Sequence, residues 1–273
     1  MEQHLSTAFL YTAIIGYGVA LLSALLLLVF GNRAFSIVSL AIMAAAFIAH
    51  AIALAARTLE FGHLPITNLY EYMTVLAWFA SAGYFFIAWK VRNPFISTLT
   101  IAVILMLMLI VALLPGEGTK NLMPALRSYW LYIHVTAAAA SEGLFAVGCA
   151  ASVLYIVKSF LSPGSRLRGK LPTEGQLDAI TYRMVVVGYV LFTLGALFAG
   201  AIWAYRAWGS FWSWDPKETS SLIVWIIYSI YLHLRINRNV QGRLPHLLSI
   251  AGFLAALATF FSSMFMGGLH SYG

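Results

Sequence analysis

The sequence predicts an all-α integral membrane protein, a bundle of about eight transmembrane helices with both termini on the outer side of the membrane. Three observations predict this class. Of the 273 residues, 62% are hydrophobic and only 9% are charged, roughly a third of the charge of a soluble domain. Eight segments are apolar and reach the length of about 20 residues that crosses a bilayer. The basic residues are distributed unevenly over the loops between those segments.

The eight expected spans follow one another along the whole chain, which predicts a single polytopic membrane domain over residues 1–273. Each span is expected to be a helix, because backbone groups in hydrocarbon must be hydrogen-bonded within their own segment. The first span lacks a basic leader and an Ala-x-Ala cleavage site, so it is expected to remain in the protein. The spans are predicted at residues 8–30, 34–56, 70–89, 95–114, 129–157, 179–203, 219–236 and 247–266.

The basic residues predict the orientation, since cytoplasmic loops carry an excess of Lys and Arg. Of the 16 basic residues, 11 belong to the side that follows the odd-numbered spans and the remaining 5 to the other side. The first set is Arg33, Lys90, Arg92, Lys158, Arg166, Arg168, Lys170, Arg183, Arg235, Arg238 and Arg243. We therefore expect a multi-pass protein of the cytoplasmic (inner) membrane, or of the thylakoid membrane if the chain is plastid-encoded. Its formal charge of +7 is then explained by topology and by attraction to anionic lipid, without nucleic acid.

Several kinds of chemistry are not supported by the sequence. Cys149 is the single cysteine, which excludes a disulfide framework and a Cys-x-x-Cys redox pair. The chain has no Cys-x-x-Cys-His segment and is not itself a c-type cytochrome. It also has no phosphate loop, metalloprotease pattern or serine nucleophile elbow. Residues 162–178, with two prolines and three glycines, are expected to form a flexible cytoplasmic loop.

The segment at residues 204–218 is the most unusual part of the chain. It contains Trp208, Trp212 and Trp214 together with Phe211, and it lies between two apolar spans. Packed side by side, these rings would make a flat apolar platform at the outer membrane surface, suited to a large planar ligand. An ordinary interfacial aromatic belt is the alternative interpretation.

Charged residues border this Trp-rich loop on both sides. Asp215, Pro216 and Glu218 form the pattern of a capping box with proline at the first helical position, which predicts that the seventh span begins here. Arg206 and Lys217 flank the aromatic residues and can pair with carboxylates of a ligand.

Of the seven histidines, four lie in or near the bilayer, where an ionisable side chain is a functional candidate by default. His134, near the outer end of the fifth span, and His270, just beyond the eighth, are at the depth of the Trp-rich loop. Two imidazoles on opposite sides of an aromatic slot are what a six-coordinate haem iron requires. A hydrogen-bonded interfacial histidine and a frayed C-terminal tail are the respective alternatives. For His4, His63 and His246, a solvated or capping role is expected.

Other polar residues are expected at different depths. His233 follows Pro216 by 17 residues (233 − 216), or about 25 Å along a helix. It therefore cannot bind the same iron as His134, and it serves either a second site or a structural role beside Arg235. His50 is expected to be a hydrogen-bonded core residue, and Glu71 a helix-capping residue. Glu142, eight residues after His134, is expected to form a hydrogen bond with a ligand histidine.

Several motifs together resemble one family of haem-handling membrane proteins. The stretch from Trp208 to Glu218 is similar to their tryptophan-rich "WWD" signature. Four further segments resemble the CcsA (ResC) type, the haem-binding subunit of the System II cytochrome c biogenesis machinery. These segments are residues 64–71, Trp130 with His134, residues 231–235 and residues 268–273.

The resemblance implies a function. Haem b would be received from the cytoplasmic side, carried to the outer face, and held there by His134 and His270 over the loop from Trp208 to Asp215. It would then be attached through thioethers to the Cys-x-x-Cys-His segment of apocytochrome c. The resemblance makes His233 a transmembrane iron ligand and implies a CcsB/ResB-like partner that supplies a second one. The chain would thus be the haem-presenting part of a cytochrome c synthase complex.

Two other functions are compatible with a polytopic membrane protein. A haem b-carrying subunit of a respiratory quinone oxidoreductase is the main alternative, but such subunits usually stack bis-histidine pairs at two depths inside the bundle. A secondary transporter is disfavoured, because the sequence lacks the interrupted helices and repeats of that class.

Overall fold

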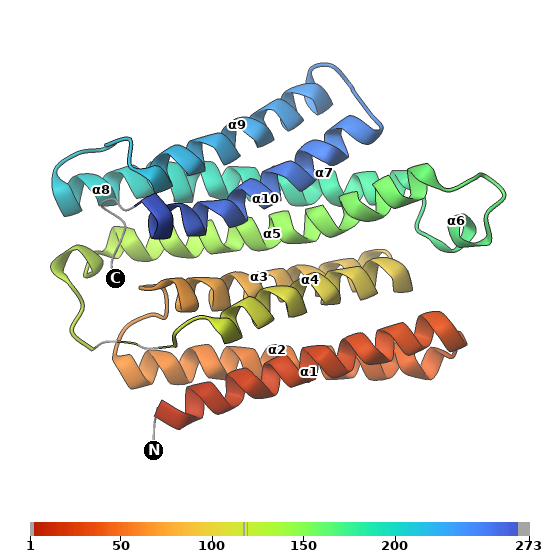
Figure 1. Cartoon of the computed structure of the whole chain (residues 1–273), viewed down its shortest axis with the longest axis horizontal. Coiled ribbons are helices and arrows are strands. Elements are labelled where there is room, and N and C mark those ends of the chain that lie inside the picture. The colour runs from red at the N-terminus through yellow and green to blue at the C-terminus, as the bar shows by residue number, and fades with distance from the viewer. Residues whose placement is uncertain (1–2, 117, 119, 267–273) are drawn as a thin grey trace. The chain divides into compact units, whose positions relative to one another are not determined.

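The computed structural model describes residues 3–116, 118 and 120–266, with side chains between Leu5 and Phe260. Within these residues the protein is helical and has no strand, which confirms the predicted fold class. Eight helices are long and apolar enough to cross a membrane. The elements, shown in Figure 1, are α1 (Gln3–Phe30), α2 (Arg33–Phe61), α3 (Leu69–Lys90), α4 (Pro94–Leu113), η1 (Pro124–Leu126), α5 (Tyr129–Phe160), α6 (Arg166–Lys170), α7 (Glu174–Leu191), η2 (Phe192–Ala199), α8 (Gly200–Trp208), α9 (Pro216–Ile236) and α10 (Arg243–Met266).

The sixth predicted span differs most from the structure. α7, the π-helical segment η2 and α8 follow one another without a break, and together they form a candidate span over Glu174–Trp208. The loop expected at residues 162–178 is therefore partly wrong: it contains α6, and its last residues belong to α7. The negative charge of Glu174 interacts favourably with the positive N-terminal end of α7, and Leu177 is fully buried. The polar residues of this segment predicted a loop, but packing stabilises the start of α7 there.

The chain divides into two compact units. The first comprises residues 1–120 and 162–173, and the second comprises residues 121–161 and 174–273. In the first unit α1 packs along α2, and α4 contacts both α1 and α3. In the second unit the long helix α5 contacts α7, η2, α8 and α10, while α9 packs against α10. α5 is thus the central element of the unit that carries the Trp-rich loop.

The interior of the first unit contains paired polar groups. His50 is fully buried, and the hydroxyl of Tyr17 lies 3.1 Å from its Nδ1, so the predicted hydrogen-bonded core histidine is confirmed. Arg57 Nε donates to Glu71 Oε1 at 2.8 Å, with both side chains buried. The cap of α3 is Asn68, whose side chain accepts from the Glu71 backbone N–H. The Glu71 carboxylate binds Arg57 and also accepts from the Thr67 N–H at 2.9 Å, so it helps to fix the start of α3 beside the cap.

Two histidines that were expected to be solvated are buried. His63 is 8% exposed, and its Nδ1 donates to the Leu64 carbonyl at 2.9 Å. His246 is fully buried, stacked on Tyr155 at 3.7 Å between ring centroids, and its Nε2 lies 3.5 Å from Asp178 Oδ1. The expectation failed for His246 because the first turn of α10 packs against other helices, where the imidazole contacts Tyr155 of α5 and Asp178 of α7. The side chain of His4 lies outside the described residues.

Candidate functional site

The Trp-rich loop is shorter than the sequence predicts. α8 continues to Trp208, so Arg206 and Trp208 belong to its last turns, and the loop proper covers residues 209–215. Gly209 ends α8 with φ of 81°, a left-handed conformation that glycine adopts without strain. Its N–H donates to the Tyr205 carbonyl at 2.9 Å. Gly209 thus ends α8 through its left-handed conformation and this hydrogen bond.

The other end of the loop is fixed by the first turn of α9. The Asp215 side chain accepts from the Lys217 N–H at 2.9 Å and completes a capping box with Glu218, which confirms the predicted pattern. Glu218 Oε2 also accepts from the Ser213 N–H at 2.7 Å. Between these contacts Trp214 has φ of 58°, a conformation that is costly for a bulky residue. The cap therefore holds Trp214 in a strained and 70% exposed position.

The aromatic rings of this region do not form one flat layer. Trp212 and Trp214 meet at 90° with centroids 5.8 Å apart, and Trp203 and Trp208 meet at 75° with centroids 4.9 Å apart. The expected flat platform is thus wrong for these pairs. Edge-to-face contact places the positive edge of one ring against the negative face of another, which two isolated rings prefer over a sandwich.

His134 lies in the second turn of α5, against the π-helical segment. Its ring stacks on Trp203 at 10° with centroids 5.8 Å apart, and its Nδ1 lies 3.2 Å from the Gly195 carbonyl oxygen. Because a carbonyl oxygen only accepts, Nδ1 must carry the hydrogen. The neutral ring then has its lone pair on Nε2. Metal-binding histidines are fixed in their tautomer in this way.

Two glycines make this contact possible. A Cβ on Gly195 would meet the Ala137 Cβ at 2.1 Å, and a Cβ on Gly200 would meet His134 Cε1 and Nδ1 at 2.8 Å. These glycines lie at the middle of η2 and directly after it. π-helical turns are frequent at functional sites. Here the segment brings its backbone close enough to α5 for a carbonyl to reach an imidazole.

Trp203 completes the support of His134, and sequence reasoning missed it. It is 2% exposed, and its Nε1 donates to the Ala125 carbonyl at 2.8 Å. It was placed at the end of a span and not in the site. The available indication was the pair Gly195 and Gly200, which precede this tryptophan by eight and three residues in the same span.

Comparison with known proteins gives the family. Residues 66–270 match the family model described as cytochrome c assembly protein. The chain belongs to this family. Cytochrome c biogenesis protein CcsA of Prochlorococcus marinus (strain MIT 9312) is 37% identical over 238 residues, which cover 78% of this chain and 77% of the relative. The CcsA protein of Prochlorococcus marinus subsp. pastoris (strain CCMP1986) is 39% identical over 249 residues, covering 82% of this chain and 79% of the relative.

These relatives make the chain a CcsA-type protein with a role in cytochrome c biogenesis, a process that handles haem. Its fold resembles that of a solved structure, the Cytochrome c Heme Lyase CcmF, with a TM-score of 0.74 and 16% sequence identity. The match covers 96% of this chain and 47% of that chain. The CcsA-type chain therefore spans about half the length of that protein, and the likeness concerns the fold alone.

The charged residues of the CcsA-type site lie on three helices. Glu142 lies on α5, and Lys217 follows the capping residue Asp215 in the first turn of α9. Arg206 is exposed on α8. The described acceptor at His134 Nδ1 is the Gly195 carbonyl, and the hydrogen bond of Glu142 to a ligand histidine stays a prediction. Lys217 and Arg206 are thus the cations nearest in sequence to the Trp-rich loop.

The remaining predicted ligands of the CcsA-type chain are His233 and His270. His233 is exposed near the end of α9, and its Nδ1 lies 3.0 Å from Asn237 Nδ2. Three exposed isoleucines precede it on the same helix: Ile223, Ile226 and Ile230. Their spacing of three and four residues places them with His233 on one side of α9. His270 lies outside the described residues.

The capping interaction of Asp215 can be tested separately from any ligand. Asp215→Ala removes the acceptor of the Lys217 N–H, so we expect the first turn of α9 to lose about 0.5–2 kcal/mol. Hydrogen exchange of residues 209–219, measured by mass spectrometry, should become faster. Asp215→Asn retains a capping oxygen and is the matched control. Equal exchange in the Ala and Asn variants would show that the cap does not hold the loop.

Proposed function

We propose that this chain is the haem-presenting subunit of a System II cytochrome c assembly machinery. It holds haem b at the outer membrane face between His134 and His270, over the Trp-rich loop, for covalent attachment to apocytochrome c. The single observation that carries the proposal is the contact of His134 Nδ1 with the Gly195 carbonyl. This contact selects the tautomer in which the lone pair that an iron can bind is on Nε2. His270 enters through the sequence resemblance.

The surroundings of His134 suit a porphyrin. Trp203 lies parallel to the imidazole, Trp208 meets Trp203 edge to face, and the exposed Trp214 offers further apolar surface. The cationic side chains of Arg206 and Lys217 are the proposed partners of the haem propionates. The capping box holds the strained loop between these groups. The aromatic groups supply area and orientation, and the cations fix the polar edge.

The reaction that this site serves requires little chemistry from the protein. Each cysteine thiol of the Cys-x-x-Cys-His segment adds across one haem vinyl group, so that one S–C bond forms and the thiol proton passes to the other vinyl carbon. This requires ferrous haem and reduced thiols. Binding of the iron between His134 and His270 fixes the vinyl edge, and the substrate histidine can then replace one ligand. The contribution of the chain is therefore proximity and orientation.

His233 supports a second part of the proposal. Histidines in transmembrane segments nearly always face protein or a water-filled cavity, yet His233 is exposed beside the isoleucine stripe. We infer that a helix of a CcsB/ResB-like partner covers this stripe and supplies the opposing ligand. Haem taken up from the cytoplasm would bind there before it reaches His134. The distance of about 25 Å along α9 separates the two sites.

The orientation in this proposal follows the distribution of basic residues. The Trp-rich loop and both termini face outward, and the loops with 11 of the 16 basic residues lie in the cytoplasm or its thylakoid equivalent. Membership in the assembly family favours this function over a permanent electron-transfer subunit. Haem would be a transported substrate and would leave with the cytochrome.

Iron binding by His134 can be tested by substitution and rescue. Purified protein should carry substoichiometric haem b with a low-spin bis-histidine absorption spectrum. In His134→Ala this spectrum should be weakened or changed, and added imidazole should restore it by filling the vacated position. His4→Ala, which removes an imidazole at the N-terminal end, should leave the spectrum unchanged. Wild-type haem content and spectrum in the double variant His134→Ala, His270→Ala would overturn the assignment.

The role of His233 can be distinguished from that of His134. In His233→Ala we expect less haem in the outer site, whereas the spectrum of the haem that does arrive should be that of the wild type. The measurement is haem content and absorption of protein purified together with its partner, alongside cytochrome c maturation in cells. A variant that loads its outer site normally yet fails to mature cytochrome c would refute the uptake role.

A further inference from the structure

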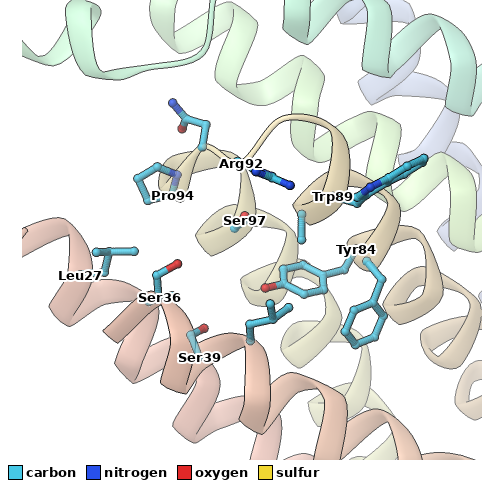
Figure 2. A pocket seen from close by; sticks show the side chains of 13 residues that line it. Leu27, Ser36, Ser39, Tyr84, Trp89, Arg92, Pro94 and Ser97 are labelled. Carbon is cyan, nitrogen blue, oxygen red and sulfur yellow. The ribbon is translucent and has the colours of Figure 1, made fainter. Parts of the chain in front are cut away.

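A cavity lies in the first unit, at the ends of α1, α2, α3 and α4 (Figure 2). Its volume is about 540 Å³, inside the range of roughly 300–1,000 Å³ typical of ligand sites. This end of the unit carries Arg33, Lys90 and Arg92, and we call it the basic end. Neither the Trp-rich loop nor His233 contributes to it. The cavity is therefore separate from the proposed haem sites.

A tyrosine hydroxyl lies on the wall of the cavity. Tyr84 is 3% exposed, and its hydroxyl has no hydrogen bond to any described residue. In Figure 2 the ring of Tyr84 points from α3 toward Ser36 and Ser39 on α2. The Ser39 hydroxyl is already used, because it donates to the Ala20 carbonyl at 3.0 Å. The Tyr84 hydroxyl is therefore a donor that an acceptor atom of a ligand in the cavity can use.

The mouth of the cavity adds positive charge and further donors. Arg92 is exposed there, forms no ion pair with a described carboxylate, and has φ of 48°. Such a conformation in a residue other than glycine is strained and is concentrated at functional positions. Ser36, near the start of α2, and Ser97, near the start of α4, line the same mouth. The positive ends of two helix dipoles thus reinforce Arg92.

The rest of the lining is apolar. Leu27 and Leu40 face the cavity from α1 and α2, and Phe85 and Ala88 face it from α3. Beside the mouth, Trp89 is 63% exposed and lies 4.0 Å below the Lys90 ammonium. A tryptophan and a lysine at the end of a span are typical of the headgroup level of a bilayer. A ligand that fits has an anionic, oxygen-rich head and an apolar tail.

We propose that this cavity binds one anionic phospholipid, with its phosphate at Arg92, Ser36 and Ser97 and an acyl chain against Leu40 and Phe85. A lipid can enter sideways from the bilayer, since exposed apolar residues such as Ile37 and Leu40 lie on the same helix. The Tyr84 hydroxyl donates to an ester or phosphate oxygen. The bound lipid joins the four helices at the end where α2 and α4 begin.

Native mass spectrometry of the detergent-solubilised protein, titrated with phosphatidylglycerol or phosphatidylcholine, tests this site. We expect one phosphatidylglycerol to bind more tightly than phosphatidylcholine. Arg92→Gln should weaken it by about tenfold through loss of a charge-assisted hydrogen bond. Arg33→Gln removes the same charge from the basic end without touching the cavity, and it should bind as the wild type does. Tyr84→Phe removes only a hydroxyl and should weaken binding less, which provides a second test if Arg92→Gln fails to accumulate.

Four results would overturn the proposal. Equal binding of the two lipids would show that no anionic headgroup is recognised, and equal losses in Arg92→Gln and Arg33→Gln would show only a surface charge effect. If equimolar haemin displaces phosphatidylglycerol, and if Arg92→Gln weakens this displacement, the cavity is assigned to haem. Inorganic phosphate in millimolar excess should not displace the lipid; if it does, the anion alone is the ligand.

Discussion

The hydrogen bond between His134 Nδ1 and the Gly195 carbonyl oxygen is the contact on which the candidate site depends. It joins α5, the central helix of its unit, to the π-helical segment in the middle of the sixth span. It also selects the tautomer, so that Nε2 is the nitrogen able to bind a metal. Without this hydrogen bond the imidazole could rotate about its side-chain bonds, and neither its orientation nor its tautomer would be fixed. The π segment is therefore part of the site and not an irregularity of the span.

The backbone arrangement explains why aromatic residues accumulate around this contact. α8 emerges from the π segment with Trp203 under the imidazole, then ends at Gly209, and the capping box at Asp215 returns the chain to the membrane on α9. A loop fixed at both ends can hold Trp214 in a strained, exposed conformation. An exposed apolar ring maintained at such a cost is suited to a ligand that covers it. The same geometry places His233 at the far end of α9, too distant to bind the same iron as His134.

Much of this could be predicted from sequence, for physical reasons. Long apolar segments have few alternatives to helices in a bilayer, so all eight spans lie close to their expected positions. The capping box was predictable because Asp215, Pro216 and Glu218 act within one turn. His50 was predictable as a core residue because its depth leaves few other options.

What could not be predicted depends on contacts between distant residues. The π segment, the approach of Gly200 to His134 and the burial of Trp203 result from packing between helices that are separated by tens of residues. The burial of His246 against Asp178 has the same origin. The perpendicular pairing of Trp212 with Trp214 depends instead on the local conformation of the loop, which the capping box fixes. Composition identified the ring types and the depth, and only the fold determined their angles and partners.

The account is tested most directly by Gly200→Ala, because the added methyl group would lie 2.8 Å from the His134 ring while every proposed ligand remains present. The measurement is electron paramagnetic resonance of the ferric haem-loaded protein. Gly175→Ala, where an added Cβ meets nothing within 4 Å, is the control. We predict that haem still binds to Gly200→Ala but that its low-spin bis-histidine signal is shifted or partly lost, whereas the control resembles the wild type. Identical signals in the two variants would contradict the claim that the π segment positions His134 as an iron ligand.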